Sequence, residues 1–289
     1  MRILLLGGTG MLGFQIFNSC LDRGLDIHAV VRNKQSILNK IGKYAENNLH
    51  IIEDIKQTEL VDDLLGKINP DYVINCVGIV KQSPLAEEYI ESVTINALLP
   101  HQLQLMGLKY DFRLIHISTD CVFDGKRGCY KEDDIPNASD LYGRSKLLGE
   151  VAYGCGLTLR TSIIGHELSD STHGLMEWLL AQNDTVKGYT KAIFSGLTTL
   201  ELTKVILDVI IPQDLPSGLY QVSSNPISKY DLIGLIAKIY HKKIKIEPSD
   251  HLLIDRSLDG SKFSKITNYT APSWSDQITE MKYYFNQHS

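Results

Sequence analysis

The sequence lacks a long hydrophobic run, a surplus of basic residues and a cysteine pair of the C-x-x-C type. The apolar run from Ile3 to Leu6 is too short for a signal-peptide core, and nothing later approaches the roughly 20 apolar residues that span a bilayer. The odd number of cysteines favours reduced thiols over a disulfide framework or a zinc site. These absences favour a soluble cytoplasmic protein. No His, Asp and Glu residues have metal-ligand spacing, so no metal is expected.

The charge balance argues against nucleic acid as a partner. The chain carries 29 Lys and Arg against 34 Asp and Glu, a net charge of −5. This balance leaves no stripe of basic residues that could follow a phosphate backbone. Its 289 residues, 43% of them hydrophobic, are enough for one large domain or two unequal ones. No internal repeat or low-complexity segment is present.

Short β-rich runs alternate with longer stretches of helical spacing, which predicts an α/β fold with a Rossmann-type, doubly wound parallel sheet. After the first strand, further strands are predicted at Ile27 to Val31, His50 to Ile52, Tyr72 to Asn75, Arg113 to Ile117 and Leu157 to Arg160. Helices are predicted at Leu12 to Arg23, Lys34 to Tyr44, Thr58 to Ile68, Tyr89 to Leu108 and Leu141 to Tyr153.

The pattern loosens after residue 162. We therefore expect a Rossmann domain over 1–162 and a mainly substrate-binding small carboxyl-terminal lobe, interleaved with the sheet, over 163–289. The elements predicted in this part are helices near Leu175 to Gln182, Leu200 to Ile210 and Lys229 to Tyr240, and a strand at Leu219 to Val222. The Gly196-Leu-Thr-Thr199 segment is interpreted as a helix start rather than a ligand loop.

The first strand leads directly into the glycine pattern Gly7-x-x-Gly10-x-x-Gly13. A helix amino terminus offers unpaired N–H groups and a positive dipole end, and glycines let a pyrophosphate approach them closely. The alternative is a glycine-rich turn without a ligand. The position between strand and helix favours a dinucleotide site.

A second motif is Tyr142-Gly-Arg-Ser-Lys146, in the first turns of a predicted helix. Residues four apart share a helix face, and a lysine cation beside a phenol lowers the phenol's pKa, which suits a proton donor. Alone, this spacing arises by chance on many helices. The predicted strand before it leads into Ser118 and Thr119, and Thr119 is positioned to donate to a substrate carbonyl.

Together these motifs resemble the extended short-chain dehydrogenase/reductase superfamily, within it the dTDP-4-dehydrorhamnose reductase branch. The matching segments are GGTGMLG, INCVGIV, STDCVFDG, YGRSKLLGE, LRTSIIG and GLYQVSS. The resemblance implies an NAD(P)-dependent oxidoreductase that reduces the 4-keto group of a nucleotide-linked 4-keto-6-deoxy sugar, in surface polysaccharide or deoxysugar biosynthesis. Because some relatives are dimers, it also allows a homodimer.

The resemblance further implies roles for individual residues. Tyr142 would protonate the oxygen at C4, Lys146 would hold the nicotinamide ribose and depress the tyrosine's pKa, and Thr119 would orient the carbonyl. The remaining cofactor contacts would come from Gly7, Thr9, Gly10, Met11, Leu12, Gly13, Asp54, Ile55, Cys76, Val77 and Gly78. For Asp54, a loop-capping role is the alternative.

The second strand ends in Arg32-Asn33-Lys34, without the acidic residue that would accept hydrogen bonds from a free ribose 2′-hydroxyl. A cationic fork matches a 2′-phosphate, which favours NADPH over NADH. The alternative for Arg32 is a solvated surface charge.

On the substrate side, the resemblance suggests Lys81, Gln82, Asp120 and Phe123, together with Arg256 for the nucleotide diphosphate. Surface salt bridging is an equally good account of Arg256.

Two further readings stay open. In the related GDP-fucose synthases, a cysteine and a histidine matching Cys121 and His173 epimerise the sugar before reduction. A buried, inert Cys121 and a His173 at a helix start are the alternatives. The β subunit of methionine adenosyltransferase resembles the same reductases yet acts as a partner protein. The second alternative hypothesis, from a different functional class, is therefore a non-catalytic NADP-binding regulatory subunit.

Overall fold

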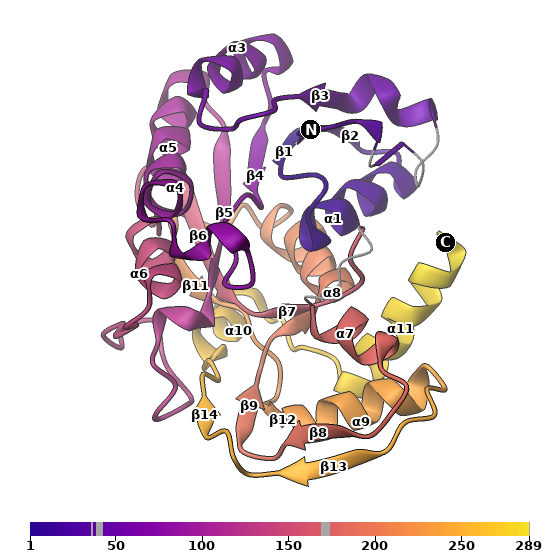
Figure 1. Cartoon of the computed structure of the whole chain (residues 1–289). Coiled ribbons are helices and arrows are strands. Elements are labelled where there is room, and N and C mark those ends of the chain that lie inside the picture. Colours follow the sequence, from indigo (N-terminus) through magenta and orange to yellow (C-terminus); the bar gives the residue numbers. More distant parts are fainter. Residues whose placement is uncertain (36, 39–42, 169–173, 289) are drawn as a thin grey trace. The chain divides into compact units, whose positions relative to one another are not determined.

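The computed structural model describes residues 1–35, 37–38, 43–168 and 174–288, and the chain divides into two compact units (Figure 1). The first unit comprises Met1–Thr119, Ser139–Leu159 and Asp214–Leu219, and the second comprises Asp120–Ala138, Arg160–Gln213 and Tyr220–Ser289. The division at residue 162 stays a prediction.

The central sheet has seven strands in the order β11-β6-β5-β4-β1-β2-β3. The pairs that join β3, β2, β1, β4 and β5 are parallel. The order reverses between β1 and β4, and this confirms the predicted Rossmann-type sheet. The strands are β1 (Arg2–Leu6), β2 (Asp26–Val31), β3 (Leu49–Ile51), β4 (Tyr72–Asn75), β5 (Arg113–Thr119), β6 (Gly156–Thr161) and β11 (Gly218–Gln221).

The first unit's helices agree with most of the predicted ones. They are α1 (Met11–Asp22), α3 (Thr58–Ile68), α4 (Tyr89–Ser92), α5 (Leu99–Tyr110) and α6 (Leu141–Leu148), with the π-helical η3 (Val93–Leu98) and the 3₁₀ helices η1 (Lys43–Asn48) and η2 (Pro84–Glu87). The helix predicted at 34–44 lies partly outside the described residues.

The helix predicted to run to Tyr153 was too long, because α6 ends at Leu148. Gly149 follows it in close contact with η3. A Cβ at this position would lie 1.9 Å from the carbonyl oxygen of Asn96. Only glycine allows the chain to pass the π-helical turn this closely.

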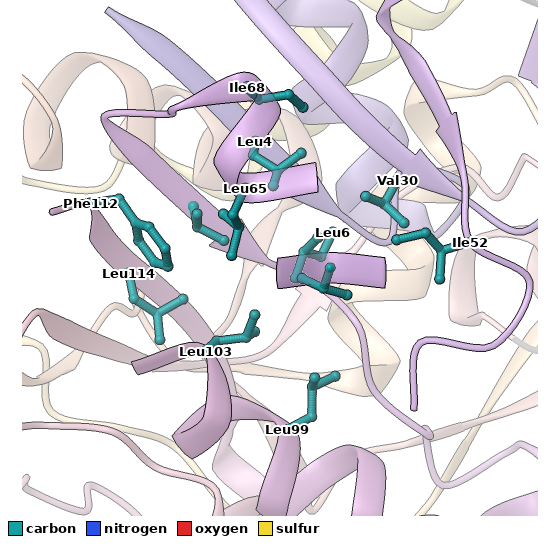
Figure 2. Packing of buried hydrophobic residues seen from close by; sticks show 12 residues of the cluster. Leu4, Leu6, Val30, Ile52, Leu65, Ile68, Leu99, Leu103, Phe112 and Leu114 are labelled. Atoms are coloured by element: carbon teal, nitrogen blue, oxygen red, sulfur yellow. The ribbon is translucent and has the colours of Figure 1, made fainter. Parts of the chain in front are cut away.

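The core of the first unit joins the sheet to two helices (Figure 2). Leu4 and Leu6 of β1 pack in one cluster with Leu65 of α3 and with Leu99 and Leu103 of α5. All of β1 from position 3 to 6 is fully buried, as expected for a central parallel strand that is covered on both faces.

The second unit contains short strands that pair locally: β7 with β10, β8 with β13, and β9 with β12 and β14. Its core includes Met176, Leu232, Trp274 and Ile278. The helices predicted near 175–182, 200–210 and 229–240 are confirmed. The elements are η4 (Asp120–Val122), β7 (Ile163–Ile164), α7 (Leu175–Ala181), β8 (Val186–Tyr189), β9 (Ala192–Phe194), β10 (Leu197–Thr198), α8 (Thr199–Lys204), η5 (Val205–Ile210), β12 (Ile227–Ser228), α9 (Lys229–Ile239), β13 (Ile246–Ser249), β14 (Ile254–Asp255), α10 (Ser261–Thr267) and α11 (Trp274–Gln287).

Thr198 caps α8 by accepting a hydrogen bond from the Glu201 backbone N–H at 3.2 Å, so the segment at 196–199 is a helix start, as predicted. None of the helices formed by the described residues combines the length and the apolar character that a membrane crossing requires.

Candidate functional site

The glycine loop after β1 is shaped by close backbone contacts. Gly7 has a φ of +87°, and its carbonyl accepts a hydrogen bond from the Gly10 N–H at 3.0 Å. A Cβ on Gly13 would lie 2.1 Å from that same carbonyl oxygen, so only glycine lets α1 start this close to the turn. The N-cap residue of α1 is Gly10, which has no side chain to cap the helix. The first N–H groups of α1 are therefore suited to bind an anion.

This loop meets the end of β4 at the point where the strand order reverses. A Cβ on Gly7 would lie 3.1 Å from both the carbonyl carbon of Cys76 and the backbone nitrogen of Val77. Ligands of open α/β sheets bind outside the carboxyl ends of the strands at such a switch point. The structure therefore brings together two of the predicted cofactor-binding segments.

Helix α6 carries Tyr142 and Lys146, and its start is held by Asp140. One carboxylate oxygen of Asp140 accepts a hydrogen bond from the Gly143 N–H at 2.8 Å, and the other lies 2.9 Å from the Lys81 ammonium. Lys81, predicted on the substrate side, is thus tied to the N-cap of α6. The cap fixes where α6 begins and hence where its tyrosine and lysine project.

Replacing Asp140 by alanine is expected to lower the free energy of unfolding by about 1 kcal/mol, because the N-cap acceptor is lost. Asp140→Asn keeps an acceptor oxygen and removes only a half-exposed ion pair, so it is expected to cost less. Urea denaturation of the two variants measures the difference. Equal losses would show that the ion pair, rather than the cap, holds the helix start.

Lys146 is buried, with 5% of its surface exposed, and its ammonium donates to the backbone carbonyl of Ile117 at 2.7 Å. A Cβ on Gly78 would lie 3.8 Å from its Nζ. The lysine therefore lies beside the segment after β4 and beside the end of β5. Burial lowers its pKa from 10.5 to about 8, against the opposing effects of Glu150 and Cys76.

Thr119 ends β5 two residues after the carbonyl that Lys146 binds, and it is 7% exposed. Tyr142 lies one turn before Lys146 on α6 and is half-buried. Because α6 packs against β5, the three predicted catalytic residues belong to one region of the first unit. Ser118, left without a defined role by the sequence, donates a hydrogen bond to Glu150 at 2.8 Å.

Asn96 is a buried site residue that the sequence analysis missed. Its Oδ1 accepts a hydrogen bond from the Ile79 N–H at 2.8 Å, and its Nδ2 donates to the Ile79 carbonyl at 3.0 Å and to Ser145 Oγ at 3.1 Å. It therefore joins the segment after β4 to α6. It stands in a π-helical turn, which no simple helical periodicity predicts.

Two predicted cofactor residues have defined surroundings. Arg32 is exposed directly after β2 and takes part in none of the ion pairs found among the described residues. The Asp54 carboxylate accepts a hydrogen bond from the Lys56 N–H at 3.0 Å and lies 3.6 Å from the Lys56 ammonium. Asp54 thus caps its own loop, which was the alternative reading, and its adenine contact stays a prediction.

Of the remaining predicted substrate residues, Gln82 belongs to the first unit, whereas Asp120, Phe123 and Arg256 belong to the second. Asp120 accepts a hydrogen bond from the Ser162 hydroxyl. Arg256 Nε donates to the carbonyl of Phe123 at 2.8 Å. The Phe123 side chain is completely buried and stacks on Tyr130, with ring centroids 4.1 Å apart, so it packs in the core and faces no solvent.

Of the two residues considered for epimerisation, Cys121 lies in η4 and is partly exposed. His173 lies outside the described residues. Among the residues that the structure describes, no group of three or more His, Cys, Asp and Glu is arranged to hold a metal ion.

The chain is similar to known proteins along most of its length. A family model described as "RmlD substrate binding domain" matches residues 1–282. The "Probable low-salt glycan biosynthesis reductase Agl14" of Haloferax volcanii is 32% identical over 219 residues, which is 70% of each chain. The dTDP-4-dehydrorhamnose reductase of Aggregatibacter actinomycetemcomitans is 25% identical over 80% of this chain and 76% of its own length.

A solved structure has a similar fold. The dTDP-4-dehydrorhamnose reductase of Bacillus anthracis, crystallised in complex with NADP, superposes with a TM-score of 0.79 at 20% identity, over 98% of this chain and 99% of that one.

Proposed function

Because the chain belongs to the RmlD substrate binding domain family, we propose that it uses NADPH to reduce the 4-keto group of a nucleotide-linked 4-keto-6-deoxy sugar. By class it is an oxidoreductase acting on a nucleotide sugar. We assign the reaction to surface polysaccharide or deoxysugar biosynthesis, in line with the names of the relatives. The observation that carries the proposal is the position of Lys146, next to both the segment after β4 and the end of β5.

The residues present fit a dinucleotide. A Cβ on Gly7 or on Gly13 would lie close to backbone atoms, so the loop keeps this shape only with glycine at both positions. The first N–H groups of α1 follow the loop directly. The loop at Gly10 to Gly13 would bind the pyrophosphate, and Lys146 would bind the nicotinamide ribose. When bound, NADPH supplies the hydride that reduces the keto carbon.

The chain's own residues supply the proton and the orientation. Thr119 donates a hydrogen bond to the keto oxygen and so fixes its position. Tyr142 gives its phenolic proton to that oxygen as the alcohol forms. The Lys146 cation stabilises the resulting phenolate, which makes the phenol a stronger acid.

The direct test is NADPH oxidation by the purified protein in the presence of dTDP-4-dehydrorhamnose and of other nucleotide-linked 4-keto-6-deoxy sugars. We expect oxidation only when such a keto sugar is supplied. NADPH binding without turnover on any of them would contradict the proposal and favour a non-catalytic NADP-binding subunit.

The same assay in D₂O separates simple reduction from the bifunctional epimerase reading. Epimerisation exchanges carbon-bound hydrogens beside the keto group, whereas reduction alone does not. We expect no such exchange. Deuterium at these carbons would assign acid and base roles to residues such as Cys121 and His173.

Arg32→Ala is expected to weaken NADPH binding about tenfold and to leave NADH binding unchanged, because an arginine fork pairs with the 2′-phosphate. Fluorescence titration with the two cofactors measures both affinities. Arg23→Ala, at the exposed end of α1, serves as the matched control for lost positive charge. Equal weakening of NADPH and NADH binding would show that Arg32 does not bind the 2′-phosphate.

A further inference from the structure

A histidine inside β5 stands out because it is completely buried. His116 lies three residues before Thr119 in a strand whose other interior positions are mainly apolar. A buried polar ring is costly unless its polar atoms are hydrogen-bonded. Both ring nitrogens have neighbours: Asn75 Nδ2 lies 3.1 Å from Nδ1, and Lys146 Nζ lies 3.4 Å from Nε2. His116 therefore bridges the last residue of β4 and the lysine of α6.

The position of the ring hydrogen follows from Asn75. The Val77 backbone N–H donates to Asn75 Oδ1 at 3.0 Å, and this identifies the oxygen end of the amide. The NH₂ end then faces His116 Nδ1, and an NH₂ group can only donate. Nδ1 is therefore the acceptor, and a neutral ring carries its hydrogen on Nε2.

The ring is neutral for a separate reason. Burial, together with the nearby Lys146 cation, holds the pKa of His116 well below its usual range. The Nε2–H then points towards Lys146 Nζ. An ammonium has no lone pair to accept this hydrogen, whereas a neutral amine has one. The N–H of His116 thus favours the lysine form that has given up its proton.

On the basis of the proposed function, we propose that Asn75 and His116 are positioning residues. Asn75 fixes His116 as the Nε2–H tautomer, and that N–H stabilises the neutral amine of Lys146 during proton delivery. The proton balance is closed. Tyr142 transfers its proton to the keto oxygen, the Lys146 ammonium transfers one to the phenolate, and the amine left behind accepts a hydrogen bond from His116. A proton from water then restores the ammonium.

The groups around Lys146 have opposing effects on its protonation, because some favour the ammonium and others the neutral amine. Tyr142 lies on its own helix, and Glu150 follows that helix and favours the charged lysine. His116 approaches from β5, and Cys76, whose pKa burial raises to about 12, lies after β4. The Ile117 carbonyl also favours the ammonium. Within this set, His116 is the neutral group whose tautomer decides which form of the lysine it stabilises.

The test uses the protein without cofactor or substrate, so it does not depend on turnover. ¹⁵N NMR of the histidine ring is expected to show the Nε2–H tautomer for His116. The Nδ1–H tautomer or an imidazolium near neutral pH would overturn the proposal. NMR titration of the Lys146 side chain supplies the second readout, with a midpoint near the pKa of about 8.

Asn75→Asp presents an acceptor to Nδ1, which moves the ring hydrogen there and leaves Nε2 to accept from the ammonium. The Lys146 midpoint is expected to rise by about one pH unit, a tenfold change in the protonation constant. The new aspartate charge could also raise the Lys146 midpoint directly, without the His116 ring. A double-mutant cycle with His116→Leu separates the effect through the ring from this direct effect. If Asn75→Asp raises the Lys146 midpoint by the same amount in the His116→Leu background, the proposal is overturned. If His116→Leu does not fold, the ring spectrum of Asn75→Asp decides: an unchanged Nε2–H tautomer contradicts the proposal.

Discussion

Tyr142→Phe is expected to lower kcat about 10²- to 10⁴-fold, the range that a positioned general acid contributes. The substitution removes only the hydroxyl and keeps the half-buried ring that α6 carries. NADPH affinity and the melting temperature are therefore expected to stay close to those of the unchanged protein. Steady-state kinetics with a nucleotide-linked 4-keto-6-deoxy sugar, together with NADPH titration and thermal unfolding, measure the three quantities.

The matched control for Tyr142 is Tyr153→Phe. Tyr153 follows α6 in the same unit, is 50% exposed, and its hydroxyl lies 2.7 Å from Nδ1 of His101. Loss of this exposed hydrogen bond is expected to leave kcat unchanged. If Tyr142→Phe retained full turnover, or if both variants lost the same activity, Tyr142 would not be the proton donor.

Gly13→Ala is expected to weaken NADPH binding at least about tenfold and to lower the free energy of unfolding by about 1–3 kcal/mol, the usual cost of overpacking. The new Cβ would lie 2.1 Å from the Gly7 carbonyl oxygen and 2.9 Å from its carbon. Both are backbone atoms, so the clash is relieved only if the turn or the start of α1 moves. Either movement displaces the N–H groups proposed to bind the pyrophosphate.

Gly234→Ala provides the control for a glycine within a helix. It lies in α9, and no atom would approach its new Cβ within 4 Å. Alanine there is expected to raise stability by about 0.5–1 kcal/mol, through helix propensity, without affecting NADPH binding. If Gly13→Ala behaved like Gly234→Ala, the close packing of α1 on the loop would not shape the binding site.

The sheet and the glycine loop were predictable because their signals are local. The Leu4 and Leu6 strand is a continuous apolar run, and the spacing from Gly7 to Gly13 marks a turn that leads into a helix. The fold class and the family are accordingly confirmed. The roles of the individual site residues remain predictions.

The other features depend on contacts between distant segments. Asn75 and His116 are 41 positions apart, and nothing in either segment shows that they meet. Many strands of the second unit have only two to four residues, too few for alternation to be recognised, for example β9 and β14. The helices α10 and α11 were missed because the tail has less regular periodicity.

We propose that this chain transfers a hydride from NADPH to the keto carbon of a nucleotide-linked deoxysugar. Mass spectrometry of the product formed with NADPH carrying two deuterium atoms at C4 of the nicotinamide tests it most directly. We expect a sugar heavier by one deuterium, bound at C4, and at least about a hundredfold less labelled product with Tyr142→Phe in the same reaction time. Recovery of the keto sugar unlabelled and unreduced, while labelled NADPH remains bound, would contradict it.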